Sequence, residues 1–171
     1  GFFKKPVQMA ALIEPLTILT EAARQAGHTI IWGRSHYPER ESRPEPLRPP
    51  RPDAARFANV PMNSDMLASG HAGRPCCIEG SSGADFPEPI LAMQHDSDLH
   101  LIKTRYSAFG ETELEEMLRQ RQIEEVFIAG VVTNVCVRAT VTDAFFLGFD
   151  VTVVSDCVSA TRANLHREAL A

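Results

Sequence analysis

One of the four cysteines, Cys136, stands where a thiol can act as a nucleophile. It follows the apolar run Val126–Val131 and the pair Thr133-Asn134, and a helical pattern continues from it to about Gly148. We therefore expect Cys136 in the first turn of a helix that follows a strand. Backbone N–H groups and the positive end of the helix dipole stabilise a thiolate at that place. A reactive cysteine is the first interpretation, and a buried structural cysteine is the alternative.

Lys103 is the second residue whose position indicates chemistry. It follows the short apolar run Leu99–Ile102, so it would emerge at the carboxyl end of a strand. An ammonium group beside a cysteine favours the thiolate and neutralises negative charge on a substrate oxygen. The alternative is a surface charge at a strand end. Tyr106 and Phe109 follow Lys103 closely, and they either line a substrate pocket or pack in the core.

The elements that would position these residues alternate between helix and strand. Pro15 suggests that a first helix begins near it and ends at Gly27. Thr112 and Glu115 form a capping-box pattern at the start of a later helix. Strands are expected at residues 28–32, 99–102, 126–131 and 151–154. Alternation of this kind predicts an α/β fold with a mostly parallel sheet covered on both faces, and ligands bind beyond the carboxyl ends of such strands.

The first helix and the capped helix are recognised by their apolar residues. These recur at helical spacing: Met9, Leu12, Leu16, Leu19 and Ala23 in the first, and Leu114, Met117 and Leu118 in the second.

Residues 38–89 form a long connection in this interpretation. They contain ten of the twelve prolines, and six arginines lie between Arg34 and Arg56, so neither a regular helix nor a central strand is expected. Their mixed charge favours a solvated surface segment. The alternative is a lid or a contact between subunits, because long ordered loops in compact domains are often functional.

Composition excludes several classes of function. The formal charge of −5 and the pI near 5.7 argue against a general nucleic-acid-binding surface. No apolar run approaches the roughly 20 residues that span a bilayer. We therefore expect a cytoplasmic protein of one domain over residues 1–171, without membrane or nucleic-acid partners. Residues 80–83 (Gly-Ser-Ser-Gly) lack the strand-and-helix frame of a phosphate-binding loop, and no cofactor is predicted.

The cysteines show no metal-ligand spacing. Cys76 and Cys77 are adjacent and are interpreted as partly buried thiols, and Cys157 as a core residue after the strand at 151–154. His71, His95, His100 and His166 also lack ligand spacing, and surface or structural roles suffice for them.

Three segments together resemble the isochorismatase-like cysteine hydrolases. They are Gly130–Val137 with Thr140 and Asp143, the segment Ile102–Phe109, and Val151–Cys157. The resemblance covers most of the chain from Gly27 onward. It implies a Rossmann-like three-layer fold and an Asp–Lys–Cys catalytic set, of which Lys103 and Cys136 are present here. It also implies a small-molecule substrate and a homodimer or homotetramer.

The resemblance further implies an oxyanion hole made by the backbone N–H groups of Val132 and Cys136. A cis peptide bond between Val131 and Val132 would turn the amide inward. In metal-containing nicotinamidases of the family an Asp-x-His element follows the second strand, whereas this chain has Arg34-Ser35-His36. An arginine cannot ligate a metal, so no metal is predicted.

The family's catalytic aspartate ends a first, central strand, and no residue here matches it. The chain begins at Gly1 and stops at Ala171 inside an expected helix, so we expect a domain truncated at both ends. A missing central strand leaves backbone donors and acceptors unpaired. The 171 residues alone are therefore expected to be unstable or rearranged, with little hydrolase activity.

The predicted function is hydrolysis of a small amide, ureido or carbamoyl compound through a thioester on Cys136. One alternative is an isochorismatase, which cleaves a vinyl ether and need not use a cysteine. The other is a catalytically inactive homologue that serves as a binding module or an oligomeric scaffold, which the unmatched aspartate favours.

Overall fold

The computed structural model describes residues 6–37 and 77–171. Helices and strands alternate along the chain, as the apolar patterns predicted. The helices are α1 (Pro6–Gln25), α2 (Glu88–Leu91), α3 (Leu114–Gln120), α4 (Arg138–Phe146) and α5 (Ala163–Leu170). The strands are β1 (Ile31–Ser35), β2 (Leu99–Lys103), β3 (Glu125–Val131) and β4 (Asp150–Ser159). A 3-10 turn (Ser82–Ala84) precedes α2, and a π-helical turn (Thr133–Val137) directly precedes α4.

The strands are parallel, as predicted, but they form two separate pairs in the described part of the chain. β1 pairs with β2 so that Ser35 lies opposite Lys103 at the carboxyl end. β3 pairs with β4, and the register shifts between Ile128 and Gly130. No ladder of hydrogen bonds joins one pair to the other among the described residues. The described strands therefore form two parallel pairs and not one continuous sheet.

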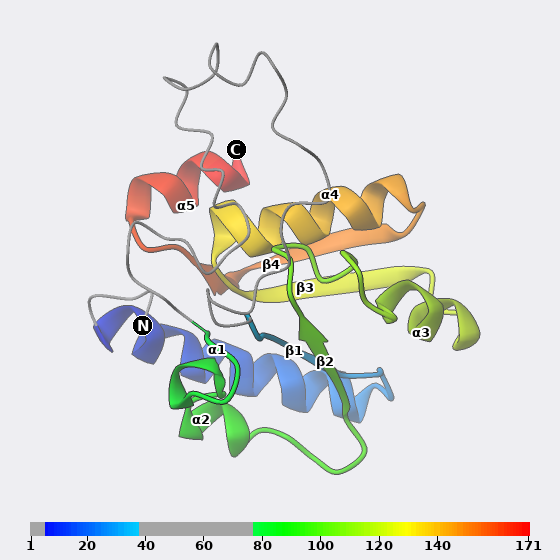
Figure 1. The fold of residues 1–171 in the computed structure, drawn as a ribbon, viewed down its shortest axis with the longest axis horizontal. Helices are drawn as coiled ribbons and strands as arrows, with labels where there is room; N and C mark the ends of the chain where they lie inside the picture. Colours follow the sequence, from blue (N-terminus) through cyan, green and yellow to red (C-terminus); the bar gives the residue numbers. More distant parts are fainter. Residues whose placement is uncertain (1–5, 38–76) are drawn as a thin grey trace.

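Helices lie on both sides of the β3–β4 pair (Figure 1). α4 and α5 contact β4 from one side, and α1 contacts it from the other. A buried apolar cluster connects β2, α3 and α4 through Leu101, Leu114, Leu118, Ala144 and Phe149. Burial of this apolar surface is the main favourable contribution to the fold. The cluster therefore holds the segment carrying Lys103 against the segment carrying Cys136.

Asp98 joins α1 to the beginning of the β1–β2 pair. The Arg24 guanidinium at the end of α1 donates to both carboxylate oxygens of Asp98, at 3.0 and 2.7 Å. The Trp32 indole N–H and the His95 backbone N–H donate to Oδ2, at 2.7 and 3.0 Å. Burial would raise the pKa of Asp98, but these hydrogen bonds and the Arg24 charge outweigh it and hold the pKa below its usual value.

The first helix and strand differ from their predicted boundaries. α1 begins at Pro6 and contains Pro15, whereas a beginning near Pro15 was predicted. Leu12, on the earlier part of this helix, is buried, and such packing can outweigh propensity. β1 begins at Ile31 instead of residue 28 because the His28 N–H donates to the Ala23 carbonyl at 2.9 Å and completes the helix end.

Three further boundaries also need correction. The Thr112 hydroxyl accepts from the Leu114 N–H at 3.2 Å, and α3 has no side-chain cap, so the predicted capping box with Glu115 is not formed. β4 extends to Ser159 and contains Cys157, which is buried as predicted but lies within the strand. α2 begins at Glu88, inside the connection predicted at residues 38–89.

Residues 38–76, including Cys76 and most of the proposed lid, lie outside the described residues. None of the helices in the two described ranges is both long and apolar enough to cross a bilayer.

Candidate active site

Lys103 is the last residue of β2, and its side chain is only 7% exposed. Its Nζ donates to the backbone carbonyls of Arg105 at 2.9 Å and Tyr106 at 3.0 Å. The Cys136 sulfur lies close enough for its charge to act on the pKa of this amine. The segment after β2 therefore folds back over the amine, which lies near the sulfur.

The charge of Lys103 is set by opposing effects. Burial lowers the pKa of this amine below its usual value, because a low-dielectric surrounding disfavours an ammonium ion. A negative charge on the Cys136 sulfur opposes the shift, as does hydrogen bonding to that sulfur, and a negative charge on Cys77 opposes it more weakly. Two sulfur atoms thus lie within electrostatic reach of one buried amine. The described groups that act on its pKa include no carboxylate.

Cys136 lies in the π-helical turn that precedes α4, and it is half-buried. The prediction placed it in the first turn of the helix, and the structure places it two residues before α4 begins. The Val137 N–H donates to the Val132 carbonyl at 3.2 Å, which closes this wide turn. The peptide bond between Val131 and Val132 is cis, the isomer that the family resemblance implies.

Two threonines hold the turn against its neighbours. The Thr140 hydroxyl donates to the Cys136 carbonyl at 2.8 Å and accepts from the Ala108 N–H at 3.0 Å. Thr133 is buried, and its hydroxyl lies 3.0 Å from Nδ1 of His166 on α5. Thr140 therefore connects the turn to the segment after Lys103, and Thr133 connects it to α5.

Asn134 and His36 carry polar atoms that the sequence did not single out for binding. Asn134 Oδ1 and His36 Nε2 are both buried, and within the described ranges they have no hydrogen-bond partner. Asn134 belongs to the Cys136 turn, and the His36 backbone N–H donates to the Lys103 carbonyl at 3.0 Å. A buried acceptor or donor without a hydrogen-bond partner destabilises the protein. A molecule that supplies the missing partner therefore binds more tightly. Nothing in the local sequence distinguishes these atoms from ordinary buried amide or imidazole atoms.

Tyr106 and Phe109 were predicted to contact substrate. The Tyr106 carbonyl accepts from Lys103, so its backbone belongs to the candidate site. The Phe109 ring stacks on Phe149 with centroids 5.8 Å apart, and it packs against the apolar cluster. The contacts of Phe109 are those of the packing alternative, and its role in binding stays a prediction.

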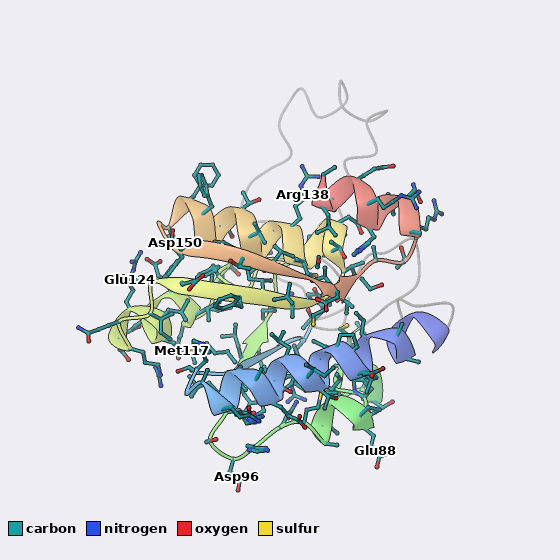
Figure 2. The ribbon with its side chains drawn as sticks, turned by 180° about the vertical axis from the view of Figure 1, so that it is seen from behind. Glu88, Asp96, Met117, Glu124, Arg138 and Asp150 are labelled. Atoms are coloured by element: carbon teal, nitrogen blue, oxygen red, sulfur yellow. The ribbon has the colours of Figure 1, made fainter. Side chains whose placement is uncertain are left out.

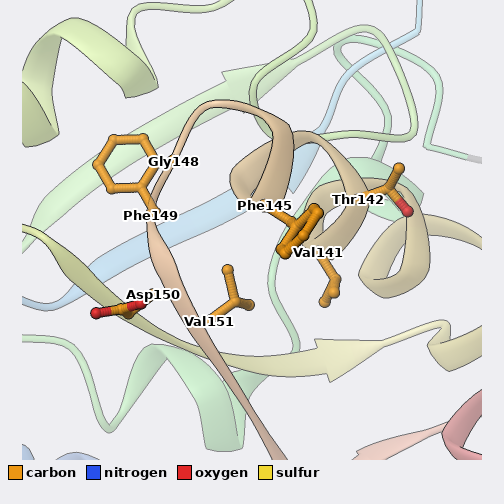
Figure 3. Close-up of a pocket in the computed structure, with 7 residues that line it drawn as sticks. All are labelled: Val141, Thr142, Phe145, Gly148, Phe149, Asp150 and Val151. Atoms are coloured by element: carbon orange, nitrogen blue, oxygen red, sulfur yellow. The ribbon is translucent and has the colours of Figure 1, made fainter.

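A hollow lies beside α4 and the start of β4, and neither Lys103 nor Cys136 lines it (Figure 3). It is lined mainly by apolar residues, among them Val141, Phe145 and Val151. In Figure 2, Glu124 and Asp150 lie at the amino ends of β3 and β4, and Arg138 is the first residue of α4. The hollow contains no cysteine, lysine or histidine, so it offers no nucleophile. The candidate catalytic residues Lys103 and Cys136 lie instead at the end of β2 and in the turn after β3.

Metal-ligating residues do not gather in the part of the chain that the structure describes. No group of three His, Cys, Asp or Glu side chains is placed to hold an ion there. Arg34, at the position of the nicotinamidase aspartate, pairs with Asp85 at 3.0 Å. The prediction that no metal binds rests on the donor set, in which an arginine replaces a carboxylate.

The family model of the isochorismatase domain matches residues 1–171. The chain belongs to the isochorismatase family. The resemblance noted from the Lys103 and Cys136 segments is thereby confirmed. The α/β fold with parallel strands is confirmed as well, because isochorismatase-family structures match it over nearly the whole chain.

Three members of the isochorismatase family illustrate the similarity. A probable inactive nicotinamidase of Arabidopsis thaliana is 31% identical over 150 residues, covering 86% of this chain and 67% of that protein. The ureidoacrylate amidohydrolase RutB of Cronobacter sakazakii is 29% identical over 147 residues, covering 86% and 60%. The crystal structure of nicotinamidase PncA from Bacillus subtilis superposes with a TM-score of 0.67 at 27% identity, covering 94% and 78%. The chain spans 55–67% of the length of curated relatives that it matches.

Proposed function

We propose that this isochorismatase-family protein is a cysteine-dependent hydrolase of a small amide, ureido or carbamoyl compound. The observation that supports the proposal most is the closeness of the buried Lys103 amine, at the end of β2, to the Cys136 sulfur in the turn after β3, whose charge acts on the pKa of the amine. A nucleophile beside a cationic group, at the edge where α/β proteins bind ligands, suits attack on a polarised carbonyl.

In the proposed reaction the Cys136 sulfur attacks the carbonyl carbon and forms a C–S bond, and the carbonyl electron pair moves to oxygen. The backbone N–H groups of Val132 and Cys136 hold this oxyanion, with Lys103 nearby. The C–N bond then breaks, and the nitrogen leaves as ammonia or an amine after taking up the proton that the Cys136 thiol gave up. Water hydrolyses the thioester to a carboxylic acid or a carbamate. The family mechanism gives the thiol proton to an aspartate, and no residue of this chain matches that base.

The substrate class is supported by the chemistry of the site and by the names of the relatives. One relative is a ureidoacrylate amidohydrolase and one similar structure is a nicotinamidase, and both names denote hydrolysis of a C–N bond. Asn134 Oδ1 is a buried acceptor that has no donor among the described residues, and an amide or ureido N–H of a substrate would supply one. We assign it a contact to the substrate beside those predicted for Tyr106 and Phe109.

Two alternatives have specific support. Cleavage of a vinyl ether fits the family name, although Cys136 favours C–N hydrolysis. A catalytically inactive binding module fits the unmatched aspartate and the relative named a probable inactive nicotinamidase. A homodimer or homotetramer in the cytoplasm belongs to the same proposal, because the family resemblance implies such assemblies.

The test is turnover by the full-length gene product on a panel of small amides, ureides and carbamoyl compounds, and on isochorismate. Ammonia release reports C–N hydrolysis, and pyruvate release reports vinyl ether cleavage. We expect ammonia from at least one amide. Cys136→Ser should reduce kcat by about 10³-fold or more, because the nucleophile is lost. Lys103→Met should reduce kcat by about 10²–10³-fold, as the loss of oxyanion stabilisation typically does.

The exposed Thr142→Ser variant is the control, and it should keep the wild-type rate. Ammonia release that survives in Cys136→Ser would refute the cysteine mechanism. Pyruvate in place of ammonia would support the first alternative, and a folded protein without turnover would support the second.

A further inference from the structure

Thr140 lies between the two segments that carry the candidate catalytic side chains. Its hydroxyl donates to the carbonyl of Cys136 at 2.8 Å and accepts from the backbone N–H of Ala108 at 3.0 Å. A hydroxyl has one donor and two acceptor sites, so both bonds form at once. One small side chain therefore contacts the backbone of the nucleophile and the backbone five residues after Lys103.

The contacts form a closed path through the site. From Ala108 the chain leads back to Tyr106 and Arg105, whose carbonyls accept from Lys103 Nζ at 3.0 and 2.9 Å. Lys103 in turn lies close enough to the Cys136 sulfur for its charge to act on the pKa of the amine, and Thr140 binds the carbonyl of the same cysteine. Removing the Thr140 hydroxyl opens this path at the point where the two segments meet. The Ala108 N–H then loses its partner as well.

We propose that Thr140 is a positioning residue that holds the Lys103 amine at the Cys136 sulfur. The expected effect on kcat rests on the proposed function. The placement of Lys103 beside Cys136 does not depend on any substrate. An error of about 1 Å in the placement of reacting groups can reduce a rate by about 10²-fold. A hydroxyl that fixes two backbones therefore affects kcat more than substrate binding.

Thr142 provides a matched comparison on the same helix. Its hydroxyl donates to the Arg138 carbonyl four residues earlier at 2.9 Å, as Thr140 does to Cys136. Thr142 is exposed, and its bond stays within α4 and the residues of that helix. Replacement of either threonine by valine removes a bond to the preceding turn. Only the replacement at Thr140 separates the Cys136 turn from the Ala108 segment.

The test compares Thr140→Val, Thr140→Ser and Thr142→Val in the full-length gene product. Iodoacetamide alkylation of Cys136 is followed by intact mass at neutral pH, with Cys136→Ser as the blank. The thiolate sulfur forms a bond to carbon and displaces iodide, so the rate reports on the ammonium beside the sulfur. We expect a several-fold slower rate in Thr140→Val, and wild-type rates in Thr140→Ser and Thr142→Val. On any amide that is hydrolysed, Thr140→Val should lower kcat by about 10-fold or more and leave KM unchanged.

A double variant separates positioning from general loss of structure. If Thr140 acts through Lys103, Thr140→Val should add little to the defect of Lys103→Met, because the group that it positions is already absent. The inference is overturned if Thr140→Val matches Thr142→Val in alkylation rate, if Thr140→Ser is as slow as Thr140→Val, or if the two defects simply add. If no amide is hydrolysed by the wild type, the proposed function fails, and the alkylation rates still decide the role of Thr140.

Discussion

Single residues at this site carry charge and polarity that burial opposes. Burial lowers the pKa of the Lys103 ammonium group, and the Cys136 and Cys77 sulfurs oppose this shift only in part. Groups that folding alone would disfavour are concentrated at functional sites. The free energy lost by burying the Lys103 ammonium group is therefore measurable as a dependence of stability on pH.

The sign of that dependence follows from proton binding. The pKa of Lys103 in the folded protein lies below its ordinary value of 10.5. Between the two values the unfolded chain binds the proton more strongly, so the free energy of unfolding should rise with pH through this window. Lys103→Met should lack this rise. Urea denaturation of both proteins at a series of pH values up to 11 gives the difference. If the free energies of unfolding of the two proteins differ by the same amount at every pH, the lowered pKa of Lys103 is contradicted.

At the residue scale the sequence predicts where Cys136 and Lys103 lie, but not the residues that support them. Each follows a recognisable apolar strand, and the family resemblance implied that the two act together. The Thr133–His166 contact joins residues 33 positions apart, and no local pattern indicates it. The same holds for Asn134, since an unmet acceptor is visible only when its surroundings are known.

At the scale of elements, one buried ion pair joins α1 to β1 and to the loop before β2. The Asp98 side chain is 4% exposed and the Arg24 side chain 19%, and Arg24 also donates to the Met93 carbonyl at 2.6 Å. The pair lies at the amino end of β2, and the candidate site lies at its carboxyl end. Its contribution should therefore be to stability and not to chemistry.

Asp98→Asn should lower the free energy of unfolding at pH 7 by about 3 kcal/mol, because it leaves a largely buried guanidinium without its counter-charge. Because the folded pKa of Asp98 is depressed, this contribution is present above its ordinary pKa of 3.8 and is lost as pH falls through the folded value. Chemical denaturation between pH 7 and pH 2 measures both effects. The exposed Asp96→Asn variant is the control, and equal losses in the two variants would refute the role of the pair.

The order of elements was predictable, whereas several boundaries were not. Apolar periodicity predicted α1, α3 and each of the four strands. The beginning of α1 was misplaced because Pro15 is tolerated inside this helix, in which Leu12 is buried. The pairing of β1 with β2 and of β3 with β4 is seen only in the structure, since an apolar run does not specify its partner strand.

At the scale of the molecule, the two strand pairs are connected by side chains. The apolar cluster brings Leu101 of β2 together with Leu114 and Leu118 of α3 and with Ala144 of α4. Because no ladder joins the pairs in the described residues, this cluster should carry much of the coupling between the Lys103 and Cys136 segments.

Leu118→Ala removes a side chain that is 3% exposed, and it should lower the free energy of unfolding by about 2–5 kcal/mol. The alkylation rate of Cys136 should change with it, since the cluster holds the two segments together. Leu91→Ala on α2, where the leucine is 50% exposed, should cost less than about 0.5 kcal/mol and leave the rate unchanged. Urea denaturation and intact mass give both quantities. A destabilised Leu118→Ala protein with a wild-type alkylation rate would show that the cluster does not couple the segments.

Trp32 is the only tryptophan of the chain, and its indole is bound to the Asp98 carboxylate. The intrinsic fluorescence of the protein is therefore the emission of one chromophore attached to the joint between α1 and the β1–β2 pair. Acid that protonates Asp98 releases the ring to water and should shift the emission to the red before the far-ultraviolet circular dichroism of the helices is lost. Trp32 fluorescence thus reports directly on the contact between α1 and the β1–β2 pair.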